Sequence, residues 1–195
     1  CLECMKATYD LLTEYALPNL SETFTIEQAL SGACVAHGET AGFELELRRS
    51  SLQAAVANIP AGTTSIGADA FTTNNAIETV IIPEGVHTIG PRAFYACSRL
   101  KEVRLPSSLR EIGDMAFAGC MALEAIDLPS GITAIGEKAF QRCSSLRRIV
   151  LPDGISLIPR ECFKACRKLE SLRLPASLML IGDNAFRGCA SLRSC

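Results

Sequence analysis

Apolar residues recur along most of this chain with a constant period of 23 residues. Four sets of residues keep the period in step: Phe71, Phe94, Phe117, Phe140, Phe163 and Phe186; Pro60, Pro83, Pro106, Pro129, Pro152 and Pro175; Ile66, Ile89, Ile112, Ile135, Ile158 and Ile181; and Ile77, Leu100, Leu123, Leu146, Leu169 and Leu192. A fixed period of this size is typical of a repeat protein. Because so short a unit cannot bury its apolar side alone, the six copies are expected to stack around one continuous core.

The first part of each repeat has the alternation of a strand. In the copy LKEVRLPSSLREIGDMAFAGCMA, Val103 and Leu105 alternate with polar residues, which predicts a short strand with one buried face. Pro106 is expected to end the strand, because proline has no N–H to donate. Stacked strands about 4.8 Å apart would form one parallel sheet.

The second part of each repeat is predicted to turn the chain back. Gly113 permits a tight bend, and Asp114 can cap a short helical turn that buries Phe117. The expected fold is therefore an α/β repeat solenoid, with a parallel sheet on its concave face and short helical turns on its convex side.

The motifs L-x-x-V-x-L-P and I-G-x-x-A-F-x-x-C together resemble the BspA-like leucine-rich repeats. The resemblance covers about residues 52–195, and leucine-rich repeats of about 20–29 residues carry the same strand signature. It implies a protein-interaction scaffold without enzymatic activity of its own, and it does not identify a partner.

Five cysteines occupy one position of the repeat: Cys97, Cys120, Cys143, Cys166 and Cys189. Neighbouring members would lie within disulfide distance, but stacked side chains point in parallel and five members cannot all pair. We expect them to be buried thiols that pack as small hydrophobes. Cys162 replaces an alanine of a neighbouring position and belongs to no separate motif.

Residues 1–50 lie outside the repeat and are predicted to form a small N-terminal helical cap or docking segment. Leu2, Met5 and Tyr9 recur at helical spacing up to Pro18, and Thr25 and Gln28 have capping-box spacing before a second short helix that closes near Gly38. Residues 43–47 alternate as in a strand.

Residues 51–195 form the second segment, with six repeats. Leu192 begins a seventh strand and the chain stops in mid-repeat. The uncovered end of the core is expected to be covered by further chain or by another protein.

A weak metal or redox hypothesis concerns Cys1, Cys4, Cys34 and His37. Their residue types suit a tetrahedral zinc site, but the gap between the two pairs is longer than in usual zinc fingers. A helix face with one disulfide is the favoured interpretation, and no cofactor is predicted.

Charge is distributed unevenly along the chain. Residues 1–50 carry eight acidic and three basic residues, and residues 138–195 carry four acidic and eleven basic residues. Such asymmetry indicates an oriented partner or surface, or only a solvated face.

Two surfaces are candidate sites for binding other proteins. The concave candidates are Ile81, Arg104, Asp127, Arg148, Val150 and Arg173. The convex candidates form a basic patch of Arg142, Arg160, Lys164, Arg167, Lys168 and Arg187. The basic patch suits an acidic protein surface or, more weakly, anionic lipid headgroups.

The sequence contains no catalytic constellation. His37 and His87 are its two histidines, no nucleophile elbow, phosphate loop or dinucleotide fingerprint occurs, and no transmembrane segment is predicted. Nucleic-acid binding is not expected, because the aromatic residues mostly fill the core.

The leading hypothesis is a non-enzymatic scaffold, acting as a structural or accessory subunit of a larger assembly. The alternatives are a surface or secreted adhesin domain, and a scaffold with an N-terminal Cys/His module. Buried thiols slightly favour a reducing intracellular or organellar compartment over the cell surface.

Overall fold

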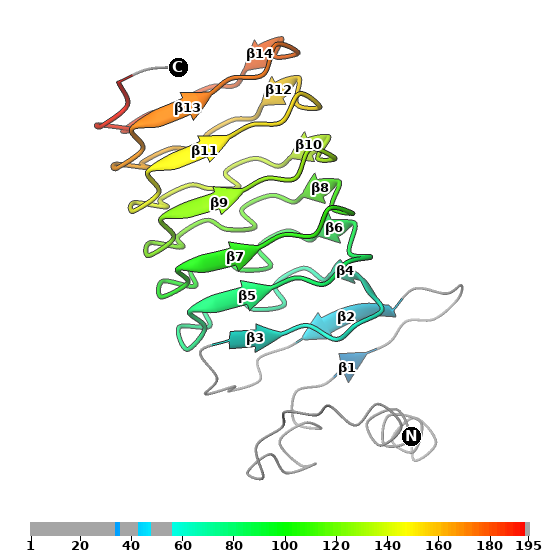
Figure 1. The fold of residues 1–195 in the computed structure, drawn as a ribbon. Helices are drawn as coiled ribbons and strands as arrows, with labels where there is room; N and C mark the ends of the chain where they lie inside the picture. The colour runs from blue at the N-terminus through cyan, green and yellow to red at the C-terminus, as the bar shows by residue number, and fades with distance from the viewer. Residues whose placement is uncertain (1–33, 36–42, 48–55, 194–195) are drawn as a thin grey trace, which may run out of the picture. The chain divides into compact units, whose positions relative to one another are not determined.

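The computed structural model describes residues 34–35, 43–47 and 56–193, which all belong to one compact unit, residues 32–195. This unit is a parallel-strand solenoid in which each repeat forms one turn (Figure 1). The first strands of the turns are β3 (Val56–Asn58), β5 (Thr79–Ile81), β7 (Glu102–Arg104), β9 (Ala125–Asp127), β11 (Arg148–Val150) and β13 (Ser171–Arg173). The second strands are β4 (Thr63–Ile66), β6 (Thr88–Ile89), β8 (Glu111–Ile112), β10 (Ala134–Ile135), β12 (Leu157–Ile158) and β14 (Leu180–Ile181).

The strands of successive turns stack in sequence order and form four hydrogen-bonded sheets. First strands pair as β3-β5-β7 and β9-β11-β13, and second strands pair as β4-β6-β8-β10 and β12-β14. Strand β2 (Phe43–Leu47) pairs parallel to β4 and antiparallel to β1 (Cys34–Val35). The predicted parallel-strand solenoid is therefore confirmed, with a second strand in each repeat that the sequence pattern did not predict.

A proline accounts for one of the hydrogen bonds that are absent between β10 and β12. In the earlier turns the residue after the second strand donates its N–H to the turn before, as Gly113 does to the Ile89 oxygen at 2.7 Å. Pro159 occupies the same position after β12 and has no N–H to donate. One bond of the ladder is therefore missing between these two strands.

The predicted helical turns on the convex side are wrong, since the described residues contain no helix. The part of each repeat after the second strand, which we call the return segment, has N–H groups that donate alternately to the next turn and within their own turn. Those of Phe94 and Ala96 donate to oxygens of the next turn at 2.8 and 2.7 Å, whereas those of Tyr95 and Cys97 donate three residues back. Because half of the donors bond to the neighbouring turn, the regular i to i−4 pattern of a helix cannot form.

Two residues of each return segment adopt the left-handed conformation that makes this alternation possible. In the second turn they are Arg92 and Ala96, with φ of 55° and 56°. Asp114, which was expected to cap a helix, accepts a hydrogen bond from the N–H of Glu137 in the next turn at 2.8 Å.

The core lies between the strands and the return segments and is built from columns, meaning residues at the same position of successive turns. The six phenylalanine rings stack in parallel, with centroids 5.0–5.6 Å apart and interplanar angles of 3–5°. Phe117 of this stack and Cys120 of the cysteine column are both fully buried. The predicted column of buried thiols is confirmed, apart from Cys189 in the last turn, which is only half-buried.

The predicted N-terminal cap falls mainly outside the described residues. This holds for the first helix and for most of the second, which was expected to include Cys34 and Val35. These two residues form a strand, so the helical prediction is wrong there. The strand predicted at Phe43–Leu47 is confirmed. The seventh strand was expected to continue into residues 194–195, which also lie outside the described part.

Candidate interaction surfaces

The outward side chains of the first strands form the first candidate surface, which we call the strand face. Alternate positions of each strand are exposed while the middle residue is buried, as in β7, β11 and β13. The parallel register places Val150 beside Asp127 on one side and Arg173 on the other, and Ile81 beside Arg104. The structure therefore brings together the concave residues that the sequence predicted.

The strand face combines exposed apolar side chains with two arginines that have no acidic partner among the described residues. Val150 is 53% and Ile81 is 43% exposed. Arg104 donates to Glu102 of the same strand at 2.7 Å. Among the described residues, no carboxylate lies within ion-pair distance of Arg148 or Arg173. Unpaired guanidinium groups beside exposed apolar side chains suit a protein partner that carries acidic groups.

The predicted basic patch contains an acidic residue, Glu161, that the sequence-based prediction did not include. Glu161 is buried and lies 3.1 Å from Lys164 and 3.9 Å from Arg160. The side-chain amide of Gln141 donates at 2.8 Å to Oε2 of Glu161, the same oxygen that Lys164 contacts. The hydrogen bond from Lys164 lowers the pKa of the Glu161 carboxyl. The single charge of Glu161 therefore offsets part of the charge of two predicted basic residues.

The remaining residues of the basic patch lie in two different places. Arg142 and Arg187 belong to return segments, whereas Arg167 and Lys168 form the turn that precedes β13. The turn lies at the margin where return segments lead into first strands, next to a further set of charged residues.

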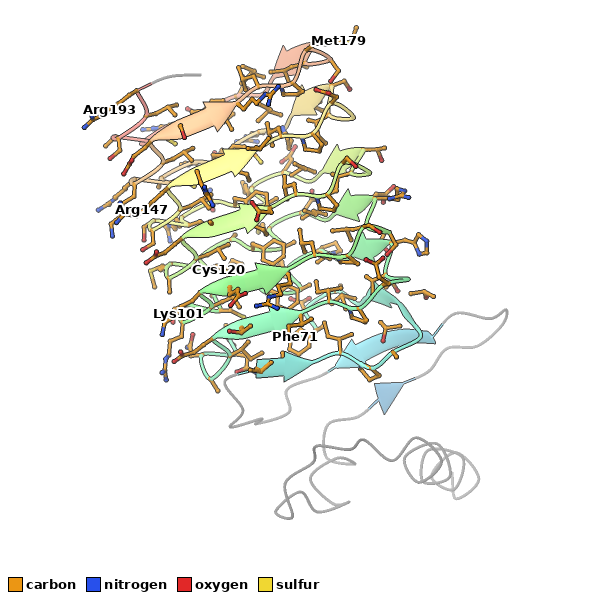
Figure 2. The ribbon with its side chains drawn as sticks, in the orientation of Figure 1. Phe71, Lys101, Cys120, Arg147, Met179 and Arg193 are labelled. Carbon is orange, nitrogen blue, oxygen red and sulfur yellow. The ribbon has the colours of Figure 1, made fainter. Side chains whose placement is uncertain are left out.

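That set, which we call the charged edge, is a column of alternating sign. Its members are Glu78, Lys101, Glu124, Arg147, Glu170 and Arg193, each 23 residues after the one before. Figure 2 shows Lys101, Arg147 and Arg193 along one margin of the solenoid. The sequence analysis missed this column, although the 23-residue register would have revealed it.

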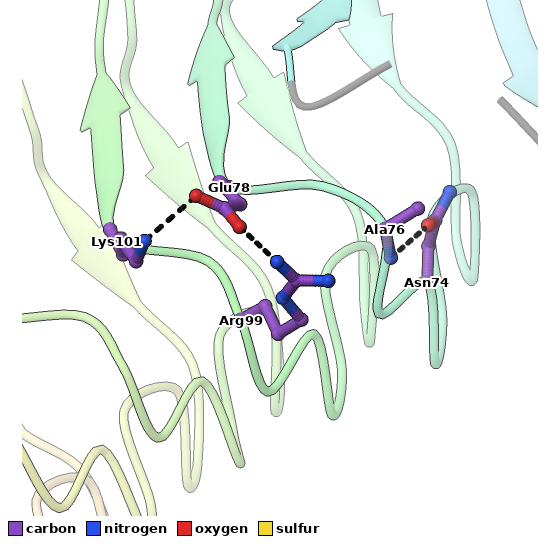
Figure 3. Close-up of polar contacts among 5 residues, drawn as sticks. All are labelled: Asn74, Ala76, Glu78, Arg99 and Lys101. Carbon is purple, nitrogen blue, oxygen red and sulfur yellow. Dashed lines mark hydrogen bonds and ion pairs between the residues drawn. The ribbon is translucent and has the colours of Figure 1, made fainter. Parts of the chain in front are cut away.

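Ion pairs join some neighbours on the charged edge. Lys101 lies 2.8 Å from Glu78, which also binds Arg99 (Figure 3), and Arg147 lies 3.2 Å from Glu170. The hydrogen bond and the charge of Lys101 lower the pKa of the Glu78 carboxyl, with a smaller contribution from Arg99. Lys101, Arg147 and Glu170 are each more than half exposed, and ion pairs at such a surface contribute little to stability.

The buried thiols are hydrogen-bonded rather than reactive. Cys143 donates to the Phe117 oxygen at 3.1 Å, and the other members of the column donate in the same way. Burial raises the pKa of the Cys97 thiol to about 12 and raises those of Cys120 and Cys143. Thiols with raised pKa values are poor nucleophiles and poor metal ligands.

The metal hypothesis concerns residues that the structure does not describe. Cys1, Cys4 and His37 lie outside the described ranges, and Cys34 is placed only as part of strand β1. In the described part of the chain, no group of three or more His, Cys, Asp or Glu side chains is arranged to hold a metal ion. The same part contains no helix long and apolar enough to cross a bilayer.

Comparison with known proteins agrees with the observed architecture. Residues 64–193 match the model for the BspA type leucine rich repeat region in six copies. Curated proteins give no significant match.

Three solved structures illustrate the likeness. The T. pallidum leucine rich repeat protein TpLRR is 26% identical with a TM-score of 0.65, covering 82% of this chain and 86% of its own. A leucine-rich repeat protein from Bacteroides ovatus is 32% identical with a TM-score of 0.61, covering 81% and 49%. A leucine rich cell surface protein from Faecalibacterium prausnitzii is 30% identical with a TM-score of 0.61, covering 78% and 34%. The chain thus spans about half and about a third of the last two proteins.

Proposed function

Because the chain belongs to the BspA-type leucine-rich-repeat family, we propose that it is a non-enzymatic scaffold for protein–protein interaction. In this proposal it acts as a structural or accessory subunit that docks on a larger protein assembly. Stacked repeats form a continuous framework on which outward residues vary from turn to turn, and such a surface suits recognition of an extended protein surface.

The strand face is the proposed docking surface, and one observation carries this choice. Arg148 and Arg173 flank the exposed Val150 and have no acidic partner among the described residues. On the return side, the single carboxylate of Glu161 lies near both Lys164 and Arg160 and offsets part of their charge. An acidic partner of the strand face would cover the exposed Val150, and its carboxylates would replace water around two unpaired guanidinium groups.

A charge-reversal comparison in the native source tests this proposal. The tagged chain and two variants would be cross-linked in gentle extracts, and their partners identified by mass spectrometry. Arg148→Glu with Arg173→Glu should abolish the specific cross-links, whereas Arg142→Glu with Arg187→Glu makes the same charge change on the return side and should retain them. Loss of the partner only in the second variant would move the docking surface to the convex basic patch.

A second candidate function is a surface or secreted recognition domain. It is favoured by the 30% identity to the Faecalibacterium prausnitzii protein, which is described as a cell surface protein. The scaffold proposal is paired with a reducing compartment, since the cysteines of the column are buried and form no disulfide among the described residues. Detection of the native protein on intact cells by surface labelling would support the recognition domain instead.

A further inference from the structure

The charges of the charged edge alternate in sign over an even number of members, so the edge is complementary to its own reverse. Read from Glu78 to Arg193, the signs are negative and positive in strict alternation over six positions. Read in reverse, every position carries the opposite sign. Two such edges therefore match at all six positions when antiparallel, and repel at all six when parallel and in register.

We propose that the charged edge is the contact surface for a second copy of this chain, arranged antiparallel about a two-fold axis. Glu78 would then face Arg193 of the other copy, Lys101 would face Glu170, and Glu124 would face Arg147. Each contact occurs twice, as in any isologous interface, and the axis passes between Glu124 and Arg147.

A second copy matches this surface better than a partner of uniform charge. An acidic partner would meet three glutamates, and a basic partner would meet three basic side chains. The spacing between charges is that of the turns, about 4.8 Å, and it is identical in a second copy. The two columns therefore stay in register over their whole length.

The charged edge is accessible, and some of its members have no ion-pair partner within the chain. Lys101 is 62% exposed, and Arg147 and Glu170 are each 54% exposed. Within the described residues, Glu124 and Arg193 have no ion-pair partner. The pairs within one chain are exposed and weak, so rearranging them toward a second copy has a small cost.

One pair of basic residues next to the charged edge would repel each other in the proposed dimer. Arg99 and Lys168 occupy the same position of turns 2 and 5, so they would face each other across the two-fold axis. The contact is also narrow, and small polar interfaces are typically weak. The dimer is accordingly expected to be reversible and to weaken as added salt screens the charges.

Sedimentation velocity on the full chain over a concentration series tests this inference. The wild type should associate at about 50 mM salt and dissociate at about 500 mM. Glu124→Arg places like charges opposite each other twice at the axis and should weaken association about tenfold or more. Adding Arg147→Glu restores opposite signs across the axis, so the double variant should regain association to within about threefold.

Two further variants complete the experiment. Glu111→Arg changes the net charge as Glu124→Arg does, but on strand β8, away from the charged edge. It should leave association unchanged. Lys168→Glu replaces the repulsion with Arg99 by attraction and should strengthen association about threefold or more. Circular dichroism checks that each variant is folded, and Arg147→Glu alone replaces Glu124→Arg if that variant does not fold.

The inference is overturned by a wild type that remains monomeric at low salt. It is equally overturned if Glu124→Arg and Glu111→Arg behave alike, or if the double variant is no better than the single one. None of these outcomes bears on the strand face, so the proposed scaffold function is tested separately.

Discussion

The thiol of Cys120 donates a hydrogen bond to the main-chain oxygen of Phe94, which lies 26 residues earlier and 3.2 Å away. This contact recurs at each later turn and explains why the repeat ends in cysteine. The thiol fills a small apolar space beside the phenylalanine stack and also supplies a weak donor to the preceding turn. The cysteines are therefore packing residues that link neighbouring turns without a covalent bond.

The buried thiols are expected to resist alkylation in the folded protein. With a pKa of about 12 for Cys97, the thiolate fraction at pH 8 is about a thousandfold below that of a thiol at the ordinary value of 9.0. Intact-mass analysis after treatment with N-ethylmaleimide should show Cys97, Cys120, Cys143 and Cys166 unlabelled, and labelled only after denaturation. Rapid native labelling of Cys143 would contradict this account of the column.

Removal of one ring from the phenylalanine stack is expected to destabilise the whole solenoid. Phe117 is fully buried between two other rings, so Phe117→Ala should lower the free energy of unfolding by about 3–5 kcal/mol. Urea denaturation followed by circular dichroism measures the change. Met121, which is 51% exposed, provides the control, because Met121→Ala should change stability by less than about 0.5 kcal/mol.

Gly113 is required for space rather than for an unusual backbone angle. A Cβ atom there would lie 2.7 Å from the nitrogen of Pro91 and 2.8 Å from the carbonyl carbon of Gly90, both in the preceding turn. Gly113→Ala should therefore cost about 2 kcal/mol or more, because main-chain atoms must move apart. Thermal unfolding measures the change. Glu137→Ala, on the exposed side of the next turn, is the control and should be nearly neutral in this measurement. Equal melting temperatures for the two variants would refute the close approach.

Acid is expected to destabilise the fold through carboxylates that are hydrogen-bonded in the native state. The N–H of Ser107 lowers the pKa of the Glu84 carboxyl below 4.5, as Lys101 does for Glu78. Since the folded pKa is lower than the unfolded one, this stabilisation is present above about pH 4.5 and is lost as the pH falls through the folded value.

The contribution of Glu84 can be isolated by substitution. Glu84→Gln should reduce the loss of stability between about pH 5 and pH 3, measured as the urea midpoint at each pH. Glu111→Gln removes a negative charge from an exposed strand position and serves as the control. An unchanged pH dependence in Glu84→Gln would show that the hydrogen bonds to Ser107 and Ser108 do not carry the effect.

The 23-residue register predicted the solenoid, the buried phenylalanine and cysteine columns, and the outward positions of the strand face. These features depend only on which side chains recur and on the alternation of a strand, and both are visible in the sequence. The return segment was mispredicted because Asp114, Ala116 and Phe117 also suit a helical turn. What excludes the helix is a set of hydrogen bonds to the next turn, which no single repeat reveals.

The functional surfaces were only partly predictable. The sequence placed Arg148, Val150 and Arg173 on one face, but it treated Lys164 and Arg160 as free charges. Their contact with the buried carboxylate of Glu161 is visible only in the structure. Ionic pairing of this kind depends on three-dimensional geometry and not on the order of charges.

Cross-linking mass spectrometry of the native complex is the most direct measurement of whether the strand face docks on a protein partner. We expect a specific partner whose acidic residues cross-link near β11 and β13, and whose recovery is lost in the Arg148→Glu, Arg173→Glu variant. A native protein that carries no partner, or a partner retained by that variant, would contradict this expectation.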